Sequence, residues 1–311
     1  MNDKIRVALL AGGRSGEREV SLKGAVGVER ALDPKKYTVR RYDPATDLGR
    51  LAAEAAEIDV AFILLHGPYG EDGTVQGFLD LLNIPYQGSG VLGSALAMHK
   101  HLAKIHYRHA GLTVPDWLLL SPGDLERDEV LARAPLPGVI KPVGQGSSLG
   151  MSIARSREEL VRGLADAFRY GDEVMVEQFV KGREITGGVL GNADLVALPL
   201  VEIIPGAEYA FFDYTAKYQP GASKEICPAE FDAATTARAQ EIAVAAHRAL
   251  HLRGYSRTDM MVAEDGAIYV IETNTIPGMA PTSLLPQAAM AHGLDFGALL
   301  DRLLALALEK R

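Results

Sequence analysis

Two carboxylates, Asp259 and Glu272, stand in neighbouring apolar segments toward the carboxyl end of the sequence. Between the segments lies the pair Asp265-Gly266, which predicts a two-residue turn joining two antiparallel strands. That turn pairs Glu264 with Ala267, and counting back from it puts Asp259 directly opposite Glu272. Opposed side chains on a hairpin have Cβ atoms about 5 Å apart, so two like charges there repel unless a cation lies between them.

The same count puts Arg257 opposite Asn274, on the face that carries the two carboxylates, because side chains alternate along a strand. Carboxylate and amide oxygens are the ligands that Mg²⁺ takes, commonly with phosphate oxygens completing its shell. The alternative is a solvated hairpin whose acidic side chains face water. The apolar neighbours Met260 and Val270 leave little room for an exposed strand pair, so the pattern favours a magnesium site.

A second polar segment, 139–154 (VIKPVGQGSSLGMSIA), predicts two short strands separated by a loop rich in glycine and serine. Glycines let backbone N–H groups approach a phosphate, serine hydroxyls add donors, and Lys141 before the loop supplies a positive charge. The Walker A pattern GxxxxGK[ST] is absent, and a flexible hairpin is the alternative interpretation. The lysine at the end of the first strand favours phosphate binding.

The elements that must position these groups belong to a chain of 311 residues, enough for about two domains. A net charge of −8 argues against nucleic acid or an anionic membrane as a general partner. No apolar run approaches the roughly 18 residues of a membrane span, and the amino-terminal run is shorter than that of a signal peptide. With Cys227 as the single cysteine, no disulfide forms within the chain, and a cytoplasmic location is expected.

The first hundred residues predict repeated strand-then-helix units of an α/β domain. A buried strand over 5–10 ends at glycines, and a helix follows from about Glu17, so that its N-terminus favours an anion. The spacing GGxxG differs from the dinucleotide pattern GxGxxG, which argues against a Rossmann cofactor site. A second strand over 59–65 ends at His66, where α/β sheets bind ligands. The structural alternatives are a Glu17 that complements the helix dipole and a hydrogen-bonded loop histidine.

Two later segments carry further candidate groups. The strand-like run 174–180 contains Glu177, and Glu184 follows it; such carboxylates can accept from an adenine amino group or from ribose hydroxyls, although plain core and surface is the alternative. The connection over 205–230 is long and rich in Gly, Pro and aromatic residues, which is typical of a lid or binding loop. It contains Lys217 and Tyr218.

Motifs follow one another along the whole chain in a specific order: GGRSGEREVS, HGPYGEDG, the lysine at 100, KPVGQGSSLGMS, VEQFVKGREIT, DYTAKY, RTDMMV, ETNTIPGM and SLLP. This order resembles that of the D-alanine–D-alanine ligases, which have the ATP-grasp fold. The resemblance implies an α/β (α+β) architecture: an amino-terminal doubly wound α/β domain over 1–100, a central lid domain over 101–184, and a carboxy-terminal metal-binding catalytic domain over 185–311. ATP would lie between the last two.

The resemblance also implies a role for each matching residue. Two Mg²⁺ ions, or Mn²⁺ in their place, would be held by Asp259, Glu272 and Asn274, with Glu272 bridging. Nucleotide contacts would come from Lys100, Lys141, Gly146, Ser147, Ser148, Glu177, Phe179, Val180, Glu184 and Ile271, and Lys217 would neutralise the transferred γ-phosphoryl group. Glu17 would bind the ammonium of the first D-alanine near His66, and Ser283 with the Leu284 N–H would bind the carboxylate of the second. Arg257 and the Gly278 N–H would stabilise the oxyanion, and Glu17, Ser147 and Tyr218 would form a hydrogen-bonded chain.

The implied reaction joins two D-alanine molecules through an acyl phosphate and releases ADP and phosphate, for peptidoglycan precursor synthesis by a homodimer. Tyr218 favours amide formation, since related ligases that make a D-alanyl-D-lactate ester carry a different residue there. The alternatives are another ATP-grasp carboxylate–amine or D-alanine–D-lactate ligase, and a non-catalytic nucleotide-binding protein. Three positions depart from the commoner family pattern, namely His99, Gln145 and Phe212.

Overall fold

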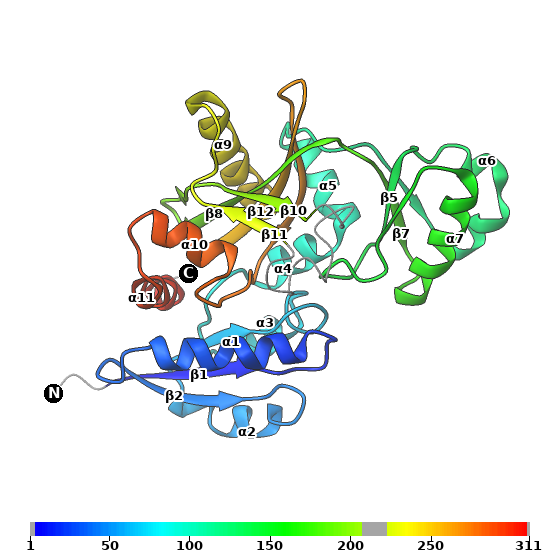
Figure 1. Cartoon of the computed structure of the whole chain (residues 1–311). Helices are drawn as coiled ribbons and strands as arrows, with labels where there is room; N and C mark the ends of the chain where they lie inside the picture. The colour runs from blue at the N-terminus through cyan, green and yellow to red at the C-terminus, as the bar shows by residue number, and fades with distance from the viewer. Residues whose placement is uncertain (1–3, 207–222, 310–311) are drawn as a thin grey trace.

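The computed structural model describes residues 4–206 and 223–309, whose strands form three sheets (Figure 1). The amino-terminal sheet is parallel, with strand order β2-β1-β3. Its elements are β1 Ile5–Ala11, α1 Arg18–Ala31, β2 Tyr37–Tyr42, α2 Leu48–Ala53, η1 Ala55–Glu57, β3 Val60–Leu64, α3 Thr74–Leu81 and α4 Val91–Met98. Beyond β3, one isolated parallel bridge links Ala61 to Tyr86.

The continuous apolar run of β1 is buried on both faces, as expected for a parallel strand covered from two sides. Leu9 packs in one apolar cluster and Leu10 in another. The Leu9 cluster also contains Leu300 and Leu303 of the last helix, α11 (Phe296–Leu308). The amino-terminal sheet and the carboxy-terminal helix therefore share one core, and Figure 1 shows α11 beside the blue amino-terminal part.

The central part has an antiparallel sheet of order β4-β7-β5-β6 with a helical layer on one side, on the right of Figure 1. It contains α5 Lys100–His109, β4 Trp117–Leu120, η2 Pro122–Glu126, α6 Asp128–Leu131, β5 Gly138–Pro142, β6 Ser152–Ala154, α7 Arg157–Ala167, η3 Phe168–Tyr170 and β7 Val174–Gln178. Helices α4 and α5 are separated at His99, whose Nδ1 accepts a hydrogen bond from the N–H of Leu102 and caps α5.

The carboxy-terminal sheet has the strand order β11-β10-β8-β12-β13, with β9 paired to β8. Its elements are β8 Gly182–Gly191, β9 Val196–Ala197, β10 Val201–Pro205, β11 Ser223–Ile226, α9 Ala233–Ala249, β12 Gly254–Ala263, β13 Ile268–Asn274, α10 Leu284–Ala291 and α11. The long connection expected over 205–230 is wrong at its end, since residues 223–226 form strand β11 and pair with β10. None of the helices in the described ranges is long and apolar enough to cross a membrane.

Candidate active site

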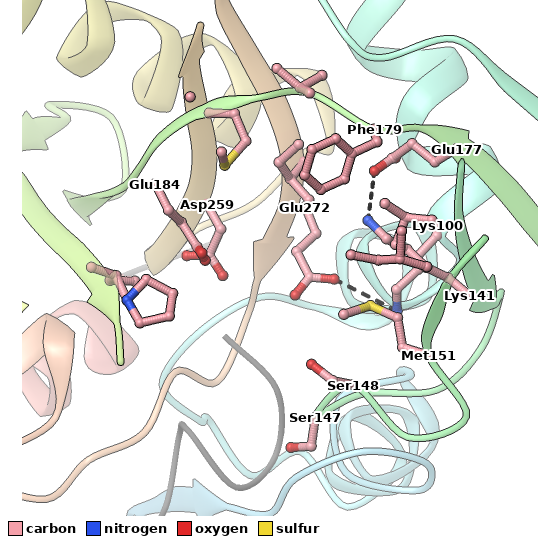
Figure 2. Close-up of a pocket in the computed structure, with 18 of the residues that line it drawn as sticks. Lys100, Lys141, Ser147, Ser148, Met151, Glu177, Phe179, Glu184, Asp259 and Glu272 are labelled. Carbon is pink, nitrogen blue, oxygen red and sulfur yellow. Dashed lines mark hydrogen bonds and ion pairs between the residues drawn. The ribbon is translucent and has the colours of Figure 1, made fainter. Parts of the chain in front are cut away.

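A cavity of about 540 Å³ lies between the central and carboxy-terminal sheets, and Figure 2 shows charged side chains entering it from both. The predicted site residues that line it are Lys100, Lys141, Gly146, Ser147, Ser148, Glu177, Phe179, Val180, Glu184, Asp259, Ile271 and Glu272. These residues come from α5, β5, β7, β8, β12, β13, the β5–β6 loop and the β7–β8 connection, so the fold brings together groups that are far apart in the sequence. Lys217, Tyr218 and Phe212 lie outside the described residues.

The register of the β12–β13 hairpin is as predicted at the carboxylates but not at the turn. Asp259 pairs with Glu272 and Arg257 with Asn274. The predicted pairing of Glu264 with Ala267 is wrong: the N–H of Ala263 bonds to the carbonyl of Ala267, so the loop is one residue longer. A β-bulge beside Asp259 restores the count.

The bulge also changes which side chains face the cavity. Ile271 and Glu272 are consecutive, and strict alternation would send them to opposite faces, yet both line the cavity. A bulge places an extra residue on one strand and re-aims its side chain. The irregularity therefore lets one strand supply both an apolar wall and a carboxylate.

Asp259 is held by three neighbours in a buried position. Arg257 donates two hydrogen bonds to it, each of 2.8 Å, the hydroxyl of Thr186 donates one of 2.7 Å, and the Asn274 amide donates one of 3.1 Å. Glu272 lies across the hairpin, with its carboxylate 3.7 Å from the ammonium of Lys100. The four hydrogen bonds to Asp259 thus fix the orientation of its carboxylate.

The donor set of the hairpin fits a hard divalent cation. Asp259, Glu272 and Asn274 offer carboxylate and amide oxygens from two paired strands, the chemistry that Mg²⁺ prefers. Among the described residues, no group of three His, Cys, Asp or Glu side chains could hold a metal by itself. Because Mg²⁺ takes an octahedral shell, three side chains leave positions that phosphate oxygens of a nucleotide in the adjoining cavity would fill.

Next to the hairpin, Glu177 is buried between two lysines. Its carboxylate lies 2.6 Å from the Lys141 ammonium and 2.5 Å from that of Lys104. Burial opposes the ionisation of Glu177, but Lys104 and then Lys141 outweigh it and hold the pKa of that carboxyl below its usual value.

The β5–β6 loop has the strained geometry that often marks a binding loop. Ser147 and Ser148 both have positive φ, 49° and 58°, which is uncommon for residues other than glycine. The backbone carbonyl of Gln145 in the same loop accepts a hydrogen bond of 2.5 Å from Lys100. The loop is therefore tied to the lysine that also approaches Glu272.

The loop also reaches the amino-terminal domain, since the Ser147 hydroxyl donates a hydrogen bond to Glu17. Glu17 is buried, and its carboxylate raises the pKa of the neighbouring His66, although burial dominates and the pKa of His66 is lowered. The expected contact between Glu17 and Ser147 is thus present, whereas its continuation to Tyr218 lies outside the described residues.

The predicted acceptor residues stand at the start of a helix. Ser283 precedes α10, which begins at Leu284, and the Ser283 hydroxyl accepts a hydrogen bond of 3.2 Å from the N–H of Ala280. A Cβ added to Gly278 would stand 3.1 Å from the same hydroxyl. The free N–H groups of a helix N-terminus favour a carboxylate, so this corner is suited to an anion.

Three residues that sequence reasoning missed also take part in the site. Lys104 follows Lys100 by one helical turn on α5, a spacing that could have indicated a shared face. Glu71 lies in HGPYGEDG and accepts hydrogen bonds from the N–H of Gly67 (2.8 Å) and of Ile276 (3.3 Å), joining the first domain to the segment before Gly278. Thr186 pairs with Asp259 across β8 and β12.

Comparison with known proteins agrees over almost the whole chain. Residues 107–305 match the family model of the D-ala D-ala ligase C-terminus, and residues 43–89 match that of the D-ala D-ala ligase N-terminus. The D-alanine–D-alanine ligase of Desulfotalea psychrophila is 61% identical over 99% of this chain and 96% of the relative. That of Syntrophobacter fumaroxidans is 58% identical over 99% of both chains.

Solved structures give the same result. The D-alanine–D-alanine ligase of Bacillus anthracis complexed with ATP has a TM-score of 0.85 at 36% identity, covering 98% of this chain and 97% of that one. VanG D-Ala:D-Ser ligase of Enterococcus faecalis has a TM-score of 0.86 at 32% identity, covering 98% and 100%. The expected ATP-grasp fold is confirmed, and with it the class of ATP-dependent ligases. The chain belongs to the D-alanine–D-alanine ligase family.

Glu71 generates a prediction about the pH dependence of stability. Burial and the charge of Glu17 raise the pKa of Glu71 to about 8, against the two backbone donors. Between its ordinary pKa and about 8 the folded protein holds a proton that the unfolded chain has released, so this group lowers the free energy of unfolding as pH rises, by about 1.4 kcal/mol per pH unit at most. Glu71→Gln, neutral at every pH, should flatten that fall.

Urea unfolding at about pH 5.5 and pH 8 measures the effect. The exposed Glu126→Gln is the control variant, and it should keep the slope of the parent protein. An equal slope in Glu71→Gln and the parent protein would contradict the assignment of this titration to Glu71.

Proposed function

We propose that this protein joins two D-alanine molecules to D-alanyl-D-alanine at the cavity between the two sheets, and that the residues around it divide into nucleotide, metal and amino-acid sites. The observation that carries the division is the convergence of Lys100, Lys141, Glu272 and the β5–β6 loop on one cavity. Lys100 and Lys141 lie at the end of the cavity that we assign to the phosphates, and Glu272 lies at the end that we assign to the metal ions. Neither phosphate binding nor metal binding requires a covalent nucleophile from the protein.

The reaction proceeds in two steps. A carboxylate oxygen of the first D-alanine attacks the γ-phosphorus of ATP, which forms D-alanyl phosphate and releases ADP. The amine of the second D-alanine then attacks the acyl carbon, phosphate leaves, and the amine gives up a proton. Phosphoryl transfer of this kind depends on positioning and on neutralising charge, and those are the tasks that the side chains here can perform.

At the phosphate end, Lys100 and Lys141 neutralise phosphate oxygens, and the N–H groups and hydroxyls of Gly146, Ser147 and Ser148 donate to them. Glu177 and Glu184 accept from the adenosine, with Phe179, Val180 and Ile271 as apolar walls. Lys217, in the undescribed segment, is assigned to the γ-phosphoryl group. The support for this arrangement is that every residue named except Lys217 lines the cavity.

At the metal end, Asp259, Glu272 and Asn274 would hold two Mg²⁺ ions, with Glu272 bridging them, and Mn²⁺ fits the same oxygen donors. Bound there, the ions supply charge neutralisation for the transferred phosphoryl group. Arg257 contributes a second function from the same hairpin. Together with the Gly278 N–H it stabilises the oxyanion of the tetrahedral intermediate, a contribution of about 3 kcal/mol per donor in comparable sites.

The amino-acid sites lie toward the first domain. Glu17 binds the ammonium of the first D-alanine near His66, and Ser283 with the Leu284 N–H binds the carboxylate of the second. The start of α10 at Leu284 supports the latter assignment, because the first N–H groups of a helix favour an anion. Tyr218 completes the chain from Glu17 and Ser147 and favours an amine over a hydroxyl acceptor.

We further propose that the enzyme acts in the cytoplasm, in peptidoglycan precursor synthesis, as a homodimer. Support for a dimer comes from exposed apolar side chains on two contacting helices: Leu81 on α3 is 83% exposed, and Leu92 on α4 is 60% exposed. Burying such side chains in an interface stabilises association.

The assay that tests the function is phosphate release from Mg-ATP with D-alanine, beside L-alanine and D-alanine plus D-lactate. Release with D-alanine alone, and a dipeptide identified by mass spectrometry, is the expected result. D-serine serves as a second acceptor, because the similar VanG protein is a D-Ala:D-Ser ligase. Preferential formation of a mixed product would move the protein to another specificity within the class.

Asp259→Asn and Glu272→Gln should each lower kcat by about 100-fold or more, because each removes an anionic metal ligand without changing side-chain size. The fold should persist, as measured by circular dichroism. Asp80→Asn, on the outer part of α3, is the control and should keep the parent rate. A Glu272→Gln variant with near-parent activity would remove the hairpin from the metal site.

Light scattering during size-exclusion chromatography tests the dimer. The expected mass is about twice the 33.4 kDa of the chain, and Leu92→Asp should shift the protein toward the monomer by placing a charge in the interface. Glu126→Asp serves as the exposed control. A parent protein that elutes as a monomer at micromolar concentration would rule out the stable dimer.

A further inference from the structure

The feature that the proposed reaction does not use is Lys104. Its side chain is 1% exposed, and a buried lysine is rare unless it is paired. It pairs with Glu177, whose other carboxylate oxygen is taken by Lys141. One buried anion therefore has two buried cations beside it, one more than its charge requires.

The two lysines lie on opposite sides of Glu177. Lys141 lines the cavity, as does Glu177, but Lys104 does not. Lys104 projects from α5 behind the carboxylate, with its ammonium 5.8 Å from the ring centre of Trp117. Trp117 on β4 pairs directly with Glu177 on β7, so Lys104 lies against both members of a cross-strand pair.

Because of their different positions, the side chains of Lys141 and Lys104 differ in how far they can move. Lys141 and Glu177 both border the cavity (Figure 2), so the Lys141 side chain has open space beside it into which it can turn. Lys104 has no such path. A nucleotide phosphate entering the cavity would compete with Glu177 for Lys141 alone.

Removing the only counter-ion of a buried carboxylate is strongly unfavourable. If Lys141 were the single partner of Glu177, its move toward a phosphate would leave that carboxylate buried and uncompensated. With Lys104 in place, the carboxylate keeps one ion pair throughout.

We infer that Lys104 is a positioning residue for the nucleotide site: it holds Glu177 charged and fixed, and so releases Lys141 for the phosphates of the nucleotide. The inference rests on the proposed ATP site. The charged groups around Glu177 are Lys104 from α5 and Lys141 from β5, while Glu272 of β13 acts on Lys104 from farther away.

Lys104→Met keeps the apolar stem and removes the charge. Calorimetric titration with Mg²⁺ and a non-hydrolysable ATP analogue should show affinity reduced about tenfold. The loss should be larger at about pH 6 than at about pH 8, because Glu177 with a single lysine takes up a proton more readily. The KM for ATP should rise while the KM for D-alanine stays unchanged. Lys36→Met, which removes an exposed pair with Asp301, is the control and should bind like the parent.

Lys141→Met provides a contrast, since Lys104 still compensates Glu177 in that variant. Its affinity should fall by the same factor at both pH values. A Lys104→Met variant that loses affinity equally at both, or whose two KM values rise together with a lower kcat, would show a structural role and overturn the inference.

A double variant keeps the test valid if Lys104→Met does not fold. Lys104→Met with Glu177→Gln replaces the pair by uncharged groups, which buried sites tolerate. It should bind the analogue as Glu177→Gln does alone, because Lys104 acts only through Glu177. A further loss of about tenfold in the double variant would contradict that. Absence of analogue binding by the parent protein would instead refute the ATP site itself.

Discussion

The site depends on the pairing of strand β12 with both of its neighbours. β12 pairs along its full length with β8 on one side, and its residues 257–262 pair with β13 on the other. Asp259 therefore receives the Thr186 hydroxyl from one strand and the Asn274 amide from the other, while Arg257 holds it along its own strand. A shift of one residue in either register would turn Asp259 toward the core face. The core residue Met260, fully buried next to it, fixes that register through its packing.

How much of this could be predicted from the sequence varies with the range of the interaction. The final helix over 296–308 follows from its apolar periodicity and lies where the pattern puts it. The pairing of Asp259 with Glu272 could also be predicted, but only because two errors cancelled: the loop is one residue longer than expected, and a β-bulge beside Asp259 restores the count. Dipeptide rules describe the turn and contain no information about a bulge four residues away. Helix α9 begins at Ala233 because the Asp232 side chain caps it.

The residues that were missed act through partners distant in the sequence. Lys104 resembles any surface lysine of a basic helix until β7 brings Glu177 against it. Glu71 gains its role from the N–H of Ile276, 205 residues away. Two departures from the commoner family pattern become understandable in the same way. His99 caps α5 through Nδ1, a task that an aspartate performs equally well, and the Gln145 contact with Lys100 uses the backbone carbonyl, which is independent of side-chain identity.

The site contains opposite charges in contact: Asp259 with Arg257, Glu272 with Lys100, and Glu177 with its lysines. In the proposed site, binding of magnesium and nucleotide would amount to ion exchange: phosphate would replace carboxylate at a lysine, and metal would replace ammonium at a carboxylate. Neither ion alone completes the exchange. Metal and nucleotide should thus load as one neutralised complex.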